Sequence, residues 1–217
     1  MNNISLILPT YNPDLKMLSQ ALECSDLFDE VLLHVNGNEL PPTFILPKNC
    51  KMFYQRERIP VQDALNWLIM MAEGQWILGW TDDDFFNRKE LANLLLKIKN
   101  DEIQEDIIHF PIYAGNDIDK TWTIWGDNAH VRFRTLCKEN YIPFSSIYRK
   151  DVWKKIQGYQ AGIFNDWRFW IEAIKNKCTF YYWPEKIYFH RERHKETLAN
   201  KEVKTFNKKE WLKEING

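Results

Sequence analysis

Three consecutive carboxylates, Asp82, Asp83 and Asp84, directly follow an apolar run over residues 76–80. A strand that is buried along its length does not accommodate carboxylates, so these side chains are expected at its exit, where a ligand or solvent neutralises them. Two carboxylates separated by one residue, Asp82 and Asp84, are suited to one hard divalent cation that also holds a diphosphate. The alternative is a solvated acidic turn.

A second candidate is Asn165-Asp166-Trp167, at the start of a predicted helix. Its amide and carboxylate are either functional groups or helix caps, because a helix N-terminus needs an acceptor and favours negative charge. The local sequence leaves both interpretations open.

Histidines form the third candidate. His190 and His194 lie four residues apart, among Arg191, Arg193 and Lys195. Such a cluster is either a cationic clamp on phosphate, with one histidine as a metal ligand, or an exposed basic turn.

The first hundred residues predict the elements that position these candidates. Short apolar runs that end in turn residues predict buried strands, at residues 4–8, 31–35, 52–54 and 76–80. Apolar residues at helical spacing and capping residues predict helices, at residues 12–22, 61–73 and 88–99. Asn12 is the predicted cap of the first helix and Asn87 that of the third.

Alternating strands and helices with short connections predict an α/β fold. Its central sheet is expected to be Rossmann-like and mostly parallel, with helices flanking both faces. Ligands of such sheets bind beyond the carboxyl ends of the strands. Residues 10–12, 36–38 and 82–84 are therefore expected to gather at one edge.

After residue 100 the alternation weakens. Further apolar runs predict strands, at residues 107–113, 131–133, 145–148, 179–183 and 187–190. Helices are predicted at residues 152–156, 166–175 and 207–215. Residues 114–128 are polar and aromatic without a clear period, so they form either a functional loop or a misassigned element.

The composition excludes several classes of protein. The 217 residues, 45% hydrophobic and 27% charged, fit one globular domain, and a net charge of −1 gives no general argument for nucleic-acid binding. Four scattered cysteines without a C-x-x-C pair indicate neither a zinc site nor a disulfide framework, and favour a cytoplasmic location. No signal peptide is evident, and no window approaches the ~18 to 20 apolar residues of a membrane span.

Taken together, these segments resemble the GT-A type, family 2 glycosyltransferases over most of the chain, from Ile4 to about Thr197. The motifs match in order and spacing. They are ISLILPTYN at 4–12, ALN at 64–66, GQWIL at 74–78, DDD at 82–84, GY at 158–159, FNDWRFW at 164–170 and RHKET at 193–197. In the family these correspond to the P-T-Y-N turn, the A-x-N helix, the G-E-Y-I strand, D-x-D, G-G-F, E-D-x-x-x-W and R-H-x-x-S.

The resemblance implies a nucleotide-sugar donor site in residues 1–100. The D-x-D motif of the family binds the divalent metal and the donor diphosphate, which implies Mg²⁺ or Mn²⁺ on Asp82 and Asp84. His194, in the R-H-x-x-S turn, is the better metal candidate of the two histidines. The implied donor contacts are Pro9, Thr10, Tyr11, Asn12, Asn36, Asn66, Asp82, Asp83, Arg191 and Arg193.

The resemblance also implies an inverting transfer of a hexosyl group to an acceptor hydroxyl. Asp166 matches the family's catalytic base, and partial desolvation by neighbouring aromatic rings would strengthen it. The acceptor, a saccharide or glycolipid, is assigned to residues 101–200. Its expected contacts are Trp122, Trp125, Asn165 and Trp167, although residues 114–128 are equally explained as a surface loop with two packing tryptophans.

A helix in residues 201–217, with Lys208, Lys209, Trp211 and Lys213, is expected either to touch an anionic membrane peripherally or to be solvated.

Two positions depart from the family pattern. Val35-Asn36 stands where the family commonly has an Asp pair that holds uracil or ribose, which leaves open a donor other than a UDP-sugar. Asn165 replaces the usual Glu.

Two alternative functions are considered. One is a nucleotidyltransferase, although no glycine-rich loop follows the first strand, and the other is a non-catalytic module that binds nucleotide sugars or glycans.

Overall fold

The computed structural model describes residues 2–115, 121–125, 130–162, 164–191, 207 and 210–213. The elements of the first half are β1 (Ile4–Tyr11), α1 (Leu15–Ala21), η1 (Ser25–Leu27), β2 (Glu30–Asn36), β3 (Cys50–Gln55), α2 (Val61–Met71), β4 (Trp76–Gly79), β5 (Phe85–Phe86) and α3 (Arg88–Lys99). Those of the second half are β6 (Ile107–His109), β7 (Ile112–Ala114), β8 (Trp122–Trp125), α4 (Phe133–Leu136), β9 (Ile147–Arg149), α5 (Lys150–Lys155), α6 (Asn165–Lys175), β10 (Phe180–Tyr182) and β11 (Tyr188–His190).

Within these residues, a seven-stranded central sheet has the order β10-β6-β9-β4-β1-β2-β3. All neighbouring strands in it are parallel except β9, which is antiparallel to both β4 and β6. The predicted mostly parallel sheet is therefore confirmed. A second sheet has the order β5-β11-β7-β8 and continues from the acidic triplet, because β5 begins directly after Asp84.

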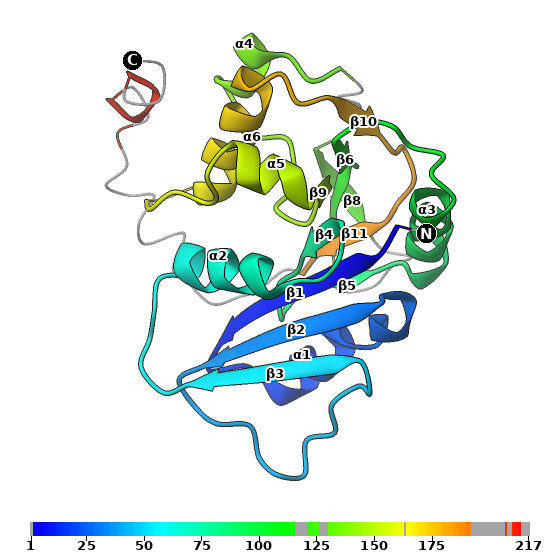
Figure 1. Cartoon of the computed structure of the whole chain (residues 1–217), viewed down its shortest axis with the longest axis vertical. Helices are drawn as coiled ribbons and strands as arrows, with labels where there is room; N and C mark the ends of the chain where they lie inside the picture. Colours follow the sequence, from blue (N-terminus) through cyan, green and yellow to red (C-terminus); the bar gives the residue numbers. More distant parts are fainter. Residues whose placement is uncertain are drawn as a thin grey trace.

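Helices cover both faces of the central sheet (Figure 1). Side chains alternate between the faces of a strand, so Leu6 and Leu8 of β1 pack in one core with α1 and α3. Ile7 points the other way, into a core shared with α2, α5 and α6. Every one of these β1 side chains is at most 1% exposed, and a strand buried on both faces reads as the continuous apolar run seen in the sequence.

The start of α1 differs from the prediction. β1 continues through Tyr11, and the cap of α1 is Asp14, whose carboxylate accepts from the backbone N–H groups of Lys16 (2.9 Å) and Met17 (3.1 Å). Asn12 adopts a φ of 48°, and its side-chain oxygen instead accepts from the backbone N–H of Asn38 at 2.8 Å. The predicted cap of α3 is confirmed, because the Asn87 side chain accepts from the Glu90 N–H.

Two predicted strands differ from the structure. Residues 107–113 form two strands in different sheets, because the chain turns at Phe110-Pro111, where proline lacks an N–H for the ladder. Residues 131–133 lead into the helix α4, since burying Leu136 against the α6 core outweighs the strand propensity of Val131 and Phe133.

No helix in the described part of the chain is long and apolar enough to cross a membrane.

Candidate active site

A cavity of about 850 Å³ opens at the carboxyl ends of β1 and β2. Parallel pairing places Tyr11 opposite Asn36, so the ends of these strands reach the same edge of the sheet. The wall is completed by the segment before α2, the acidic triplet and the start of α6. The lining residues are Pro9, Thr10, Tyr11, His34, Asn36, Arg58, Ile59, Pro60, Val61, Gln62, Ala64, Asp82, Gly162, Phe164, Asn165 and Asp166.

Asp82 is the member of the acidic triplet that lines this cavity. It is half-buried, and one of its oxygens accepts a hydrogen bond from the Thr10 hydroxyl. This bond joins the exit of β1 to the exit of β4, two parallel neighbours in the central sheet. Asp83 is also half-buried.

Asp84 is only 2% exposed and lies in a polar cluster, called the sealed cluster below, whose outer member His190 has a side chain that is 51% exposed. Its carboxylate accepts hydrogen bonds from the hydroxyls of Thr81 (2.7 Å) and Tyr188 (2.5 Å) and from the backbone N–H of Arg191 (2.9 Å). His190 Nδ1 lies 3.2 Å from the same carboxylate. Burial acts to raise the pKa of Asp84, but His190, Tyr188 and the Arg191 N–H outweigh it and hold the pKa below its usual value. The cluster fastens the acidic turn to the end of β11.

Asp166 reaches the cavity from the first turn of α6. The preceding Phe164 has a φ of 55°, which turns the chain into the helix from the cavity wall. The Asn140 side chain donates to Asp166 Oδ2 at 3.0 Å. Burial raises the pKa of Asp166, while the Trp167 backbone N–H and Asn140 oppose the rise by stabilising the carboxylate. A raised pKa makes this carboxylate a stronger proton acceptor than an exposed aspartate.

Asn66, an expected donor contact, is occupied elsewhere. Its side-chain oxygen accepts from Trp153 Nε1 and from the Tyr159 N–H, and its Nδ2 donates to the Tyr159 carbonyl, each at 2.8 Å. These bonds tie α2 to the loop after α5. These bonds make Asn66 part of the framework of the fold, and its contact with the donor stays a prediction.

Trp167, an expected acceptor contact, is 5% exposed. Its Nε1 donates to the Leu136 carbonyl at 2.6 Å, and its ring centroid lies 4.8 Å from that of Trp211. The Trp167 indole is thus an interior packing group, and its contact with the acceptor stays a prediction. Trp211 is partly buried and packs against the same core.

The other expected acceptor residues belong to two elements, α6 and β8. Asn165 lines the cavity beside Asp166. Trp122 is 50% exposed in β8 of the second sheet, and the Trp125 backbone pairs with Ile112 in the same sheet.

Arg191 turns away from the acidic triplet towards α1. Its guanidinium donates to Gln20 Oε1 at 2.9 Å and lies 5.4 Å from the ring centroid of Phe85. The predicted contacts of Arg193 and His194 lie outside the described residues.

Several cavity residues escaped prediction from the sequence. Arg58 lies with its guanidinium carbon 4.9 Å from the ring centroid of Tyr11. Among the described residues of the wall it is the only lysine or arginine, and no carboxylate in the described part of the chain pairs with it. Arg58 could have been predicted from its position just beyond the end of a strand, as residues 10–12, 36–38 and 82–84 were. Asn140 had no local signal, because only the fold brings it to Asp166.

A metal ion in the cavity would need hard donor atoms that face it. In the described ranges, no group of three or more His, Cys, Asp or Glu side chains is arranged to hold a metal ion. Magnesium-type sites often use one or two carboxylates together with substrate phosphates and water. Asp82 fits such a site, because its hard oxygen ligands line the cavity.

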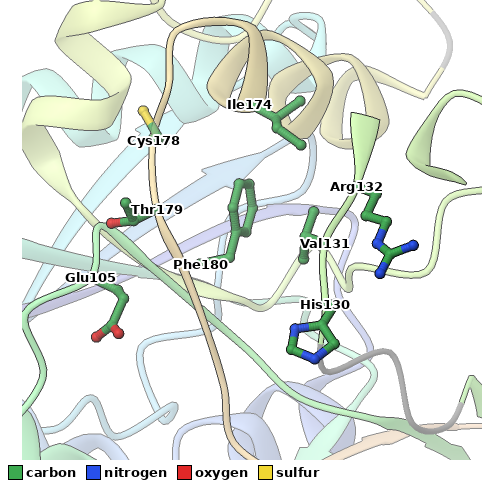
Figure 2. Close-up of a pocket in the computed structure, with 8 residues that line it drawn as sticks. All are labelled: Glu105, His130, Val131, Arg132, Ile174, Cys178, Thr179 and Phe180. Atoms are coloured by element: carbon green, nitrogen blue, oxygen red, sulfur yellow. The ribbon is translucent and has the colours of Figure 1, made fainter. Parts of the chain in front are cut away.

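A second cavity, of about 610 Å³, lies near the amino ends of β6 and β10 (Figure 2). None of the predicted site residues lines it. Its lining residues are Glu105, His130, Val131, Arg132, Ile174, Cys178, Thr179 and Phe180.

No protein-family model and no curated protein sequence matches the chain. Among solved structures, the 1–349 fragment of S. aureus TarS in complex with UDP-GlcNAc has a TM-score of 0.70 at 18% sequence identity, covering 94% of this chain and 61% of that one. S. aureus TarS in a longer form has a TM-score of 0.69 at 18% identity, covering 88% of this chain and 37% of that one.

The mannosyltransferase PcManGT from Pyrobaculum calidifontis, in complex with GDP-Man and Mn²⁺, has a TM-score of 0.60 at 13% identity, covering 87% of this chain and 56% of that one. The chain therefore spans less than two thirds of the length of each of these proteins. TarS is a family 2 glycosyltransferase of the GT-A type. At these identities the likeness concerns the fold, and it shows that the chain has the GT-A glycosyltransferase fold.

Proposed function

We propose that this chain transfers a hexosyl group from a nucleotide-diphosphate sugar to an acceptor hydroxyl, with inversion. The observation that carries the proposal is the cavity at the carboxyl edge of the GT-A sheet. One wall of it holds Asp82 from the acidic triplet, and another holds Asp166 with a raised pKa.

Asp166 acts as the general base in this proposal. It accepts the proton of the acceptor hydroxyl while the acceptor oxygen forms a bond to the anomeric carbon. The bond from that carbon to the diphosphate oxygen breaks on the opposite side, so the configuration inverts. Asn140 holds the carboxylate in place through the hydrogen bond to Oδ2.

The donor occupies the part of the cavity between Tyr11 and Asp82. Tyr11 offers an aromatic face that is 46% exposed, and Arg58 beside it offers a positive charge to an anionic nucleotide. Pro9, Thr10 and Asn36 complete the wall next to them. Contacts from Asn12, Asp83, Arg191 and Arg193 belong to the same proposal.

A divalent cation, Mn²⁺ or Mg²⁺, would be held through Asp82. The geometry favours Asp82 over Asp84, because the Asp84 carboxylate already accepts hydrogen bonds from its sealed cluster. His194 remains a proposed ligand. When bound, the cation would stabilise the charge of the departing diphosphate.

TarS has been solved with UDP and with UDP-GlcNAc, and PcManGT with GDP-Man. We propose a saccharide or glycolipid acceptor that approaches past Asn165 and the β8 segment of Trp122 and Trp125. A cytoplasmic protein with at most peripheral contact to a membrane fits this proposal.

The test combines binding and turnover. A thermal-shift screen of UDP, GDP, CDP, ADP and dTDP, with and without Mn²⁺, should show one nucleotide that raises the melting temperature, because ligands that bind the native state stabilise it. The corresponding sugar nucleotide is then incubated with candidate glycans, and release of the nucleoside diphosphate is measured.

Transfer with an inverted linkage supports the proposal. Pyrophosphate release from a nucleoside triphosphate with a sugar phosphate would instead indicate a nucleotidyltransferase. Binding without release of nucleoside diphosphate would indicate a non-catalytic module.

A further inference from the structure

Asn36 is 4% exposed at the end of β2 and forms part of the cavity wall. Its Nδ2 donates two hydrogen bonds, to the Gln55 carbonyl at 2.9 Å and to the Glu57 carbonyl. Its Oδ1 accepts a third, from the Ile59 N–H at 2.9 Å. One side chain thus fastens three alternate backbone positions of the segment 55–59.

An amide is the only common side-chain group of this shape that meets these partners. Two carbonyl oxygens lie on one side and an N–H on the other, which fixes the orientation of the amide. A carboxylate has no donor. At this position it would direct an anionic oxygen at two carbonyl oxygens and keep only the bond from Ile59, in a place that water reaches poorly.

The fastened segment is itself a wall of the cavity. Arg58 and Ile59 line it, and Pro60 leads directly into α2. Arg58 also lies over Tyr11 from β1. The positions of the Arg58 guanidinium and of the cavity wall beside it therefore depend on the hydrogen bonds of Asn36.

We propose that Asn36 is a positioning residue, which sets the 55–59 segment as the wall of the nucleotide cavity and acts on the donor through that segment. This inference rests on the proposed nucleotide-sugar site. It also predicts that an aspartate here, which the resembled family commonly carries, damages the site in this chain.

The test compares Asn36→Asp with Asn38→Asp, the same chemical change two residues further on at an exposed position. At pH 7 we expect Asn36→Asp to lower the melting temperature by about 5 °C or more, since two buried hydrogen bonds are lost. The control should stay within about 1 °C. The deficit of Asn36→Asp should shrink towards about pH 4, where a protonated carboxyl regains one donor.

Binding is then measured by calorimetry with UDP and with GDP, each with Mn²⁺, well below the melting temperatures. Displacement of the wall is expected to weaken every nucleotide that the wild type binds, by about tenfold and by similar factors. Asn36→Ala should do the same. A direct contact between Asn36 and the base would instead change the ratio between UDP and GDP, which would overturn the positioning role.

An Asn36→Asp variant that melts like the wild type, or that binds UDP as tightly, would also overturn the inference. If the wild type binds no nucleoside diphosphate, the proposed function fails together with the nucleotide part of this inference. The melting temperatures of Asn36→Asp and Asn38→Asp still decide separately whether Asn36 fastens the segment.

Discussion

Asp82 and Asp84 are two residues apart in the chain, yet they belong to different regions of the molecule. Asp82 lines the open cavity and meets the hydroxyl of Thr10. Asp84 is sealed beneath the end of β11, where Tyr188, His190 and the backbone of the next residue saturate its oxygens. The two carboxylates thus differ in exposure and in the number of hydrogen bonds that they accept, and their spacing in a motif does not reveal this difference.

The same contrast separates the two kinds of effect that a substitution has. In the sealed cluster, loss of the carboxylate leaves buried donors without partners, so the cost falls on folding. In the cavity wall, solvent replaces a lost contact, so the cost falls on binding and turnover. The distinction between the two regions is therefore wrong if substitutions in both change stability and ligand binding to the same extent.

The largest effect is expected from Asp84→Ala. The variant removes a buried anion and leaves the hydroxyl of Tyr188 and the N–H of Arg191 unpaired, which should lower the free energy of unfolding by about 3–5 kcal/mol. Urea unfolding monitored by tryptophan fluorescence measures this. Asp83→Ala, at the half-buried neighbour, serves as the control and should cost about 1 kcal/mol or less. An unchanged unfolding free energy with lost Mn²⁺-dependent nucleotide binding would instead make Asp84 a metal ligand.

Asp166→Asn should have the next largest effect, a loss of transfer rate. Loss of a general base typically lowers kcat by about a hundredfold or more, and the amide still accepts the hydrogen bond from Asn140. The measurement is the initial rate of sugar transfer at saturating donor. Asp151→Asn, an equivalent change in the first turn of α5, should transfer sugar at the wild-type rate. A wild-type rate in Asp166→Asn itself would remove Asp166 from the role of base.

The unfolding free energy of Asp166→Asn and its dependence on pH further distinguish Asp166 from Asp84. Burial raises the pKa of Asp166, so its ionisation costs stability, and that cost appears as the pH rises through the folded-state pKa. Asp166→Asn should therefore be at least as stable as the wild type at pH 7, and any advantage should vanish at low pH. The pKa of Asp84 is lowered, so ionisation of Asp84 stabilises the fold, and this contribution is lost as the pH falls through its folded-state pKa.

Much of the fold was predictable because its signals are local. The apolar run of β1, the Asn87 cap of α3 and the carboxylates at the end of β4 each follow from residues a few positions apart. The division of residues 107–113 into two strands also had a local signal, Pro111. The apolar residues on both sides of this proline nevertheless predicted one continuous strand.

The candidate site was predictable only in part, because partners distant in the sequence decide the role of each side chain. Asn66 matched a motif, but Trp153 and Tyr159 occupy its amide. Trp167 matched an acceptor motif, but the Leu136 carbonyl and Trp211 enclose it. Such contacts depend on tertiary packing, which a motif does not encode.

Asp82→Ala should have a smaller effect, in the open region. We expect it to weaken Mn²⁺-dependent binding of the nucleoside diphosphate by about tenfold or more, since one hard ligand is lost. The unfolding free energy should change by about 1 kcal/mol or less, because the Asp82 side chain is half-buried and Thr10 lines the same cavity, where water can replace the lost partner. Calorimetry with and without Mn²⁺ separates the two quantities. A loss of stability as large as that of Asp84→Ala would erase the distinction between the regions.

The smallest effect should come from Asn140→Leu, which keeps the approximate volume of the side chain but removes its donor. The Asn140 amide stabilises the ionised form of Asp166, so its loss should raise the pKa of the base further. Because the base works when deprotonated, the acid limb of the kcat/KM profile should move to higher pH, while the rate at high pH stays near that of the wild type. Asn93→Leu, on the outer face of α3, is the control and should not move the limb. A shift to lower pH would mean that water entering beside Asp166 outweighs the lost hydrogen bond, and that the cavity wall is as open at the base as it is at Asp82.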